Sequence, residues 1–194
     1  MNPFLSVWLH PKQTARYVIE HKTIVYALML LILGYILSGS AELFNTESYQ
    51  GLSFVWIFLI SIILVPIIGI TFMFITTGIV FLIGKLLNGT GSFWDVFKAS
   101  SISSIPAICT APFFILGTIV DEVSAVGLIL NLITIVTSIW AIVILVAAIA
   151  EAHQFSTIRS IITLIIPTII LVIFFIGVVA IIMILFAVVF DSMP

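Results

Sequence analysis

The run TIILVIFFIGVVAIIMILFAVVF, residues 168–190, is apolar almost throughout and carries no charged side chain. A helix needs about 20 such residues to cross the ~30 Å hydrocarbon core of a bilayer. Comparable runs recur along the chain, for example AIVILVAAIA at 141–150, without the apolar–polar alternation of a membrane β-strand. The sequence therefore predicts an all-α integral membrane protein.

The composition points to the same class. Of the 194 residues, 63% are hydrophobic and 7% are charged, whereas a soluble globular domain carries about 25% charged residues. The net charge of −2 gives no basis for a nucleic-acid partner. Cys109 is the only cysteine, which excludes an internal disulfide and a cysteine metal cluster. We expect no nucleic acid, cofactor or metal.

We predict five transmembrane spans within one domain, residues 23–194, at about 23–44, 53–87, 98–120, 124–150 and 160–190. Residues 1–22 form a cytosolic interfacial segment, which lacks the apolar core and small-residue cleavage site of a signal peptide. The second run is long enough for a rival interpretation, a hairpin folded back at Pro66 and Gly69.

The distribution of charge decides between these interpretations. With five spans and a cytosolic amino terminus, every basic side chain falls on the cytosolic side: Lys12, Arg16, Lys22, Lys85, Lys98 and Arg159. The acidic residues Glu42, Glu47, Asp121, Glu122 and Asp191 fall outside. A hairpin would break this positive-inside pattern, so a single second span is favoured. The external carboxyl terminus depends only on the length of the fifth run, because acidic residues contribute little to orientation.

Two segments combine aromatic and charged residues as membrane interfaces require. In the amino-terminal segment, Trp8 precedes a run of basic residues, which predicts an amphipathic helix on the cytosolic leaflet, broken or started at Pro11; the alternative is a short juxtamembrane extension. Near residue 92, Ser92 is a predicted N-cap and Asp95 completes a capping box. The candidate contacts with lipid or a partner are Trp8, Phe93, Trp94 and Phe97.

Small residues recur on one face of two predicted spans. In span four they are spaced by three and four residues, which keeps them on one side of a helix. The predicted packing face consists of Gly34, Ser38, Gly127, Thr134, Ser138 and Ala141. Small residues let helices approach closely in lipid; the alternative is a polar track through Asn131, Thr134 and Ser138. Kinks or hinges are expected at Pro66, Pro106, Pro112 and Pro167, where nearby hydroxyls could compensate for lost backbone bonds.

Three segments together resemble the Yip1 domain family, particularly its short bacterial members. GTGSFWDVFKASSISSIPA (89–107) is similar to the family's Gly-x-Gly-Ser-Phe segment, helix and proline, and LHPKQTARYVIEHK (9–22) is similar to its basic Pro-x-x-Thr entry. The short loop EAHQFSTIRS (151–160) also agrees. The resemblance implies a non-enzymatic multispan protein. Eukaryotic members act in vesicle traffic and associate with Rab GTPases and with one another, but this chain lacks their long soluble amino-terminal region, so Rab binding is not carried over.

The residues themselves indicate no enzyme. No ionisable side chain falls in the middle of a predicted span, and no catalytic motif is present. Glu151 and His153 could share a metal, but two ligands do not make a site, and we interpret them as solvated loop residues.

Two functions remain open from the sequence. The first is a membrane-organising, trafficking-type or accessory protein of a bacterial plasma membrane. Its partners would be membrane lipids and either further copies of the chain or other membrane proteins. The second is a small transporter, channel or lipid-moving protein with a polar path between spans two, three and four, lined by Ser100, Ser103, Ser104, Thr110 and Asn131.

Overall fold

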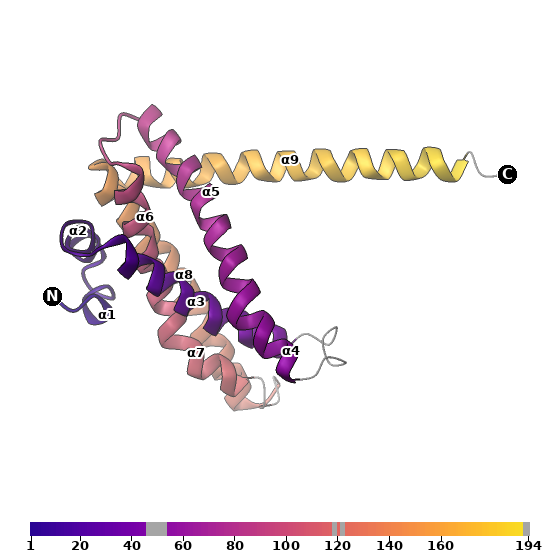
Figure 1. The fold of residues 1–194 in the computed structure, drawn as a ribbon, viewed down its shortest axis with the longest axis horizontal. Coiled ribbons are helices and arrows are strands. Elements are labelled where there is room, and N and C mark those ends of the chain that lie inside the picture. The colour runs from indigo at the N-terminus through magenta and orange to yellow at the C-terminus, as the bar shows by residue number, and fades with distance from the viewer. Residues whose placement is uncertain (46–53, 118–119, 121–122, 192–194) are drawn as a thin grey trace.

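The computed structural model describes residues 1–45, 54–117, 120 and 123–191, and these residues form helices joined by turns, with no strand among them. Two short helices at the amino terminus precede a series of longer, apolar ones (Figure 1). In chain order the α-helices are α1 (Pro3–Ser6), α2 (Pro11–His21), α3 (Ile24–Asn45), α4 (Phe54–Leu59), α5 (Val65–Leu86), α6 (Phe93–Ser101), α7 (Ile105–Gly117), α8 (Ala125–His153) and α9 (Thr157–Asp191).

Within the described residues, three continuous helical segments are long and apolar enough to cross a membrane: Ile60–Leu86, Phe93–Gly117 and Ala125–His153. Two shorter apolar segments, Ile24–Gly39 and Thr157–Ile170, lie within α3 and α9. The chain is therefore a helical membrane protein, as the sequence predicts. The crossing of the bilayer by the first and fifth runs stays a prediction.

The second predicted span is one helix that passes through Pro66 without folding back. A π turn, η2 (Ile60–Leu64), joins α4 to α5, and the N–H of Val65 donates to the carbonyl of Ile60 at its end. Proline has no N–H to give to the carbonyl four residues earlier, and a locally widened turn is one way in which a helix absorbs that loss. The structure thus confirms the single helix over the hairpin.

Pro106 is accommodated by a tighter turn. The 3-10 turn η3 (Ile102–Ser104) joins α6 to α7, and the N–H of Ile105 donates to the carbonyl of Ile102, the group that a residue with an N–H at 106 would have bonded. The Ser103 and Ser104 hydroxyls donate to other carbonyls, so the backbone itself makes this compensation. Pro112 and Pro167 lie inside α7 and α9.

Helix α7 packs against both α3 and α8, α5 packs against α3 and α6, and α9 leaves the bundle from the end of α8 (Figure 1). The best-buried core lies where α2 and α6 meet α8, and its fully buried side chains include Val7, Val18, Val96, Ile102 and Ile144. The molecule is thus packed most tightly at the end that carries its amino terminus.

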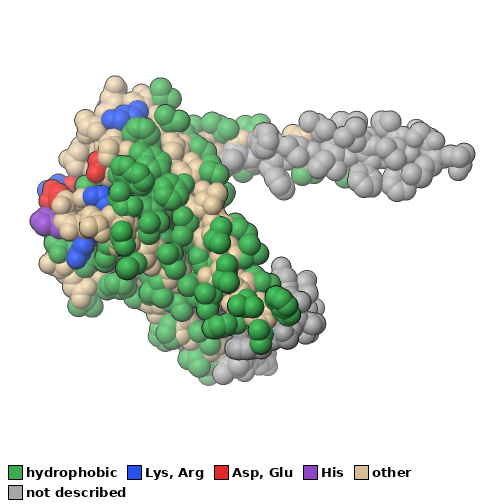
Figure 2. Space-filling model, viewed as in Figure 1, with side chains coloured by type: hydrophobic (Ala, Val, Ile, Leu, Met, Phe, Trp, Pro, Cys, Tyr) green, Lys and Arg blue, Asp and Glu red, His purple; other side chains and the backbone are tan. Residues whose placement is uncertain are grey.

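The basic side chains gather at that same end. Figure 2 shows the visible charged side chains there, with hydrophobic side chains over most of the remaining described surface. Lys12 donates to Thr157 of α9, Lys85 to the loop before α6, and Lys98 to the end of α2. We call this end, with α1, α2, the start of α6 and the α8–α9 turn, the basic end. Glu42, Glu47, Asp121, Glu122 and Asp191 lie outside the side chains that the structure describes.

Candidate functional site

The basic end contains the connection between α5 and α6, which we call the elbow, residues 87–98. Its helix begins with the predicted capping box: the Asp95 N–H donates to Ser92 Oγ at 3.2 Å, and the Ser92 N–H donates to Asp95 Oδ2 at 3.0 Å. Two backbone donors that would otherwise lack partners are satisfied in this way. The prediction for Ser92 and Asp95 is confirmed.

An aromatic cluster fixes the elbow against α5. Phe74 of α5 stacks on Phe97 with ring centroids 4.8 Å apart, and the Trp94 ring stands edge-on to both Phe74 and Phe93. Phe97 is fully buried and Phe93 is half-buried, whereas Trp94 is 44% exposed. Of the three predicted contact residues on the elbow, Trp94 is therefore the one that presents a ring to the surroundings, and Phe97 holds it from inside.

Helix α2 begins at Pro11, as the sequence predicts, and its inner face packs on protein. Thr14, Ala15 and Val18 are buried where α2 crosses α8 and α6. The Lys98 ammonium donates to the carbonyls of Ile19 and Lys22, and so caps the carboxyl end of α2. The sequence-based interpretation assigned the apolar residues of this segment to lipid; the structure gives much of that surface to the bundle.

The predicted anchor Trp8 is half-buried against the core at the basic end. Its neighbours Leu5 and Leu9, 73% and 80% exposed, are the apolar side chains that this segment leaves uncovered. Leu5 lies in α1 and Leu9 in the turn after it, and their exposure makes them the stronger candidates for lipid contact.

An ion pair joins α2 to α8. Arg16 Nε donates to Glu151 Oε1 at 2.6 Å, and Gln154 Nε2 donates to the same oxygen at 3.2 Å. The Glu151 side chain is 9% exposed and that of Arg16 is 60% exposed. The guanidinium therefore covers a buried carboxylate on its solvent side. The hydrogen bond to Glu151 raises the pKa of the Arg16 guanidinium. Solvated loop residues were the wrong interpretation for Glu151 and His153, because both are buried.

His153 occupies a closed socket beneath the elbow. Its side chain is fully buried, its ring stacks on Phe155 at 5.1 Å and 10°, and neither ring nitrogen has a hydrogen-bond partner among the described residues. The ring lies against Gly84 and Gly89, where an added Cβ would overlap the imidazole. Sequence analysis missed the socket. Its signal is the closely spaced glycines, but nothing local links them to a histidine so far along the chain.

A polar pocket of about 190 Å³ lies beside the socket, between α2, the elbow and the end of α8. Its lining includes Arg16, Glu20, Asp95, Glu151 and Gln154. Asp95 is engaged in the capping box and Glu151 in the ion pair, and the described residues contain no group of three side chains placed to hold a metal ion. This pocket therefore has the character of a structural junction.

Comparison with known proteins adds the family. A family model described as the Yip1 domain matches residues 5–181, nearly the whole chain. The chain belongs to the Yip1 domain family. No curated protein and no solved structure matches it. The matched range covers α2, the elbow and the socket, so the resemblance drawn from the elbow and the amino-terminal segment is confirmed.

The predicted polar-path residues of this Yip1 domain lie along α6, η3, α7 and α8, mostly near hollows shared with α3. One hollow, of about 230 Å³, is lined by Gly34, Ser38, Ser103 and Ser104, and a second, of about 170 Å³, by Ser38, Thr110, Thr134, Ser138 and Ala141. Ser100 is buried. The first hollow also touches Met73 of α5 and so lies between spans one, two and three, whereas the second lies between spans one, three and four. A polar path between spans two, three and four stays a prediction.

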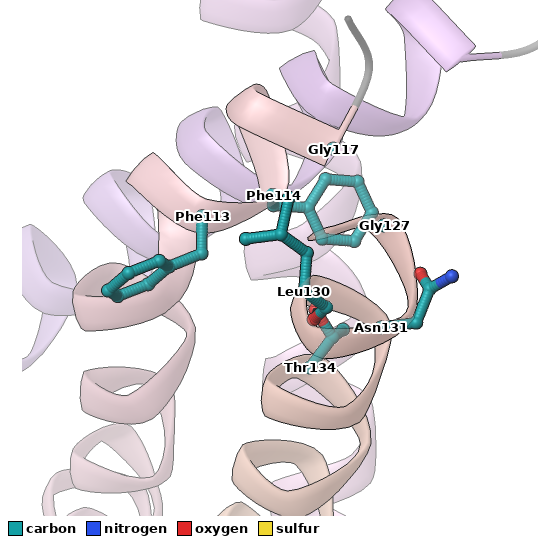
Figure 3. Close-up of a pocket in the computed structure, with 7 residues that line it drawn as sticks. All are labelled: Phe113, Phe114, Gly117, Gly127, Leu130, Asn131 and Thr134. Carbon is teal, nitrogen blue, oxygen red and sulfur yellow. The ribbon is translucent and has the colours of Figure 1, made fainter. Parts of the chain in front are cut away.

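A third hollow of about 60 Å³ contains Gly127 and Asn131 (Figure 3). There the Phe114 ring lies toward the first turns of α8, Phe113 points to the other side, and the exposed Asn131 amide points outward.

The hydroxyls beside these hollows are already engaged. Ser38, Thr110 and Ser138 each donate to the carbonyl four residues earlier in their own helix, at 2.7 to 2.8 Å. Thr134 does the same at 3.1 Å. A hydroxyl bonded in this way offers a solute little beyond its remaining lone pairs. The small residues meet the packing role more directly, since a Cβ at Gly34 would lie 3.1 Å from Ser104 Cβ.

Proposed function

We propose that this Yip1 domain is a non-enzymatic membrane-organising or accessory protein, which acts through surface contacts of its basic end and through helix contacts in the bilayer. The observation that carries the proposal is Trp94, an exposed ring mounted on an aromatic cluster at the basic end. A rigid, amphipathic aromatic of this kind is suited to the headgroup region of a membrane.

The neighbouring side chains support a lipid contact at the basic end. Leu5, Leu9 and Leu86 are 73%, 80% and 82% exposed, although they lie close to charged residues. Leucines in such a place avoid water if they enter the interface, and nearby basic side chains then face anionic headgroups, each worth about 1 kcal/mol. We therefore assign the contact to lipids, with anionic lipids preferred.

The gathering of all six Lys and Arg side chains at the basic end also supports a cytosolic amino terminus. The carboxyl terminus is then external if α9 crosses the bilayer once. We place the protein in a bacterial plasma membrane. Within that membrane, the small-residue face of α8, on which Ser138 is exposed, is available for helix contacts with further copies or other membrane proteins.

Fluorescence of variants with a single tryptophan tests whether Trp94 lies in the headgroup region. Trp94 is retained while Trp8, Trp56 and Trp140 are changed to Phe, and quenching is measured in vesicles of lipids brominated at different depths. Trp94 should be quenched by shallow bromines. A matched protein retaining only Trp140, which is 37% exposed midway along α8, should be quenched by deep bromines. Trp94 emission typical of water, quenched by aqueous iodide alone, would contradict the proposal.

Spin-labelled lipids test whether the contact organises lipid. The wild-type protein should immobilise more anionic than zwitterionic lipid per chain, and this preference should fall in the Lys12→Gln, Lys85→Gln double variant. Equal immobilisation of both lipid classes by the wild-type protein would remove the anionic-lipid part of the proposal.

A further inference from the structure

His153 is a titratable side chain whose surroundings favour its neutral form. It lies at the last residue of α8, three residues beyond the predicted span 124–150, and its side chain has no exposed surface. A neutral imidazole can be buried between an aromatic ring and glycine backbones. An imidazolium carries two N–H donors and a charge, and burial of an unpaired charge is strongly unfavourable.

The walls of the socket leave the imidazole no partner and no room to turn. Phe155 covers one face, while Gly84 at the end of α5 and Gly89 in the elbow approach the ring so closely that a methyl group would not fit at either glycine. Both ring nitrogens therefore remain unbonded within the described residues. The ring can gain a partner only if the elbow moves away from α8.

Backbone bonds make that movement a single event. The Thr90 N–H donates to the His153 carbonyl at 3.0 Å, and Lys85 Nζ donates to the Thr90 carbonyl at 3.2 Å. If residues 89–91 moved away from α8, the bond from Thr90 to the His153 carbonyl would break and the imidazole would be uncovered in the same step. The structure shows this docked arrangement, and an undocked one would lack both the bond and the burial.

The charged groups around the socket do not supply a counter-ion. Lys85 of α5 disfavours a proton on His153, and Asp95 of α6 favours one but is held in the capping box. Glu151, on α8 itself, is paired with Arg16 of α2, and Arg159 on α9 adds another positive charge after the turn. Burial, followed by Lys85, lowers the pKa of His153 below its ordinary 6.5.

We propose that His153 is a proton-operated latch: protonation of its imidazole expels the ring from the socket and releases the elbow from the end of α8. The latch goes beyond the proposed membrane contact and does not depend on what Trp94 touches. The docked state is stable above the ordinary histidine pKa and is lost as the pH falls toward the lowered one. In that range the undocked population grows by up to tenfold for each unit by which the pH falls, because undocking takes up one proton.

Hydrogen exchange and histidine NMR of the wild-type protein in nanodiscs test the latch. The Thr90 amide, corrected for intrinsic exchange, should lose protection by up to tenfold per pH unit below about 6.5. The Gly127 amide, bonded to Ser124 Oγ at the opposite end of α8, is the matched control and should not change. His153 should titrate below the ordinary histidine pKa. An ordinary titration of His153 in the docked protein would overturn the proposal.

Variants separate the latch from general acid sensitivity. His153→Leu removes the titrating group with a side chain of similar volume, and His21→Leu removes an exposed histidine whose side chain is 59% exposed. The pH dependence of Thr90 protection should vanish in the first variant and persist in the second. An unchanged pH dependence in His153→Leu would overturn the latch. If that variant fails to fold, the wild-type titration and exchange experiment still decides.

Discussion

Three glycines determine how closely the elbow approaches α8. Gly84, Gly89 and Gly91 are buried, and a Cβ at any of them would overlap His153 or the backbone of Ala152. Each glycine costs conformational entropy on folding, and here the absence of a side chain is what permits the contact. The His153 imidazole, which fills the space, is therefore held by backbone surfaces and the Phe155 ring and not by hydrogen bonds from its own nitrogens.

The first prediction concerns Gly84→Ala. The new methyl group would overlap the imidazole, so the basic end should be destabilised by about 1–3 kcal/mol, the usual cost of overpacking. Gly78→Ala, also in α5, is the control, since its Cβ would meet only Phe93 at 4.0 Å. It should raise stability by up to about 1 kcal/mol through helix propensity. Thermal unfolding in nanodiscs compares the two, and equal midpoints would contradict the tight socket.

At the scale of single residues, the sequence predicts the contacts that form between near neighbours in the chain. The capping box of Ser92 and Asp95 was predictable because both residues lie in one turn. The burial of Glu151 and His153 was not, because it depends on α2 and the elbow, which are distant in sequence. A polar residue next to a helix end is normally solvated, and only the close approach of the glycines changes that here.

At the scale of elements, proline and glycine shape the spans in different ways. Pro66 and Pro106 are absorbed by a π turn and a 3-10 turn, which change the winding without ending the helix. Gly34 lets α3 cross the η3 turn closely, and Ser104 Oγ donates to the Leu30 carbonyl of α3 at 3.4 Å beside that crossing. Close helix approach and weak interhelical hydrogen bonds of this kind are what hold helices together in lipid.

The second prediction tests that crossing. Gly34→Leu would force α3 away from Ser104, because even a Cβ would lie 3.1 Å from the Ser104 Cβ. We expect a loss of at least about 1–3 kcal/mol, as for overpacked cores, and a shift toward aggregated species in size-exclusion chromatography. Gly177→Leu in α9, where no atom lies within 4 Å of an added Cβ, should leave both unchanged. Wild-type behaviour of Gly34→Leu would show that this approach does not stabilise the bundle.

The sequence predicts elements better than their contacts. Apolar runs and the positive-inside pattern correctly give one long second helix through Pro66. The third helical segment starts at Phe93, earlier than the predicted 98, because the aromatic face of the elbow is continuous with the span. Periodicity placed small residues on α8 but could not say which helices they face; the structure places α3 beside both hollows and α5, through Met73, beside one of them.

At the scale of the whole molecule, the two ends of the bundle differ in chemistry and in packing. The basic end combines the cations, the buried core and the socket, whereas the last turn of α7 and the first turn of α8 lie at the other end (Figure 1). A chain with this asymmetry has a preferred orientation, because translocation of several Lys and Arg side chains is disfavoured. The lipid contact and the proton latch proposed here both belong to the basic end, and so would face the same compartment.

The third prediction tests that orientation with two matched positions. Leu86 at the end of α5 and Val123 before α8 are both 82% exposed and lie at opposite ends of the bundle. In a Cys109→Ser background, Leu86→Cys should react with a membrane-impermeant thiol reagent only from the cytosolic face, like a cysteine at Asn2. Val123→Cys and a carboxyl-terminal reporter should react only from outside, because five spans place them there. Intact and inverted vesicles give both faces. Labelling of Leu86→Cys and Val123→Cys from the same side would exclude an α6–α7 crossing. If both react as expected but the carboxyl-terminal reporter is cytosolic, only the predicted crossing by α9 is wrong.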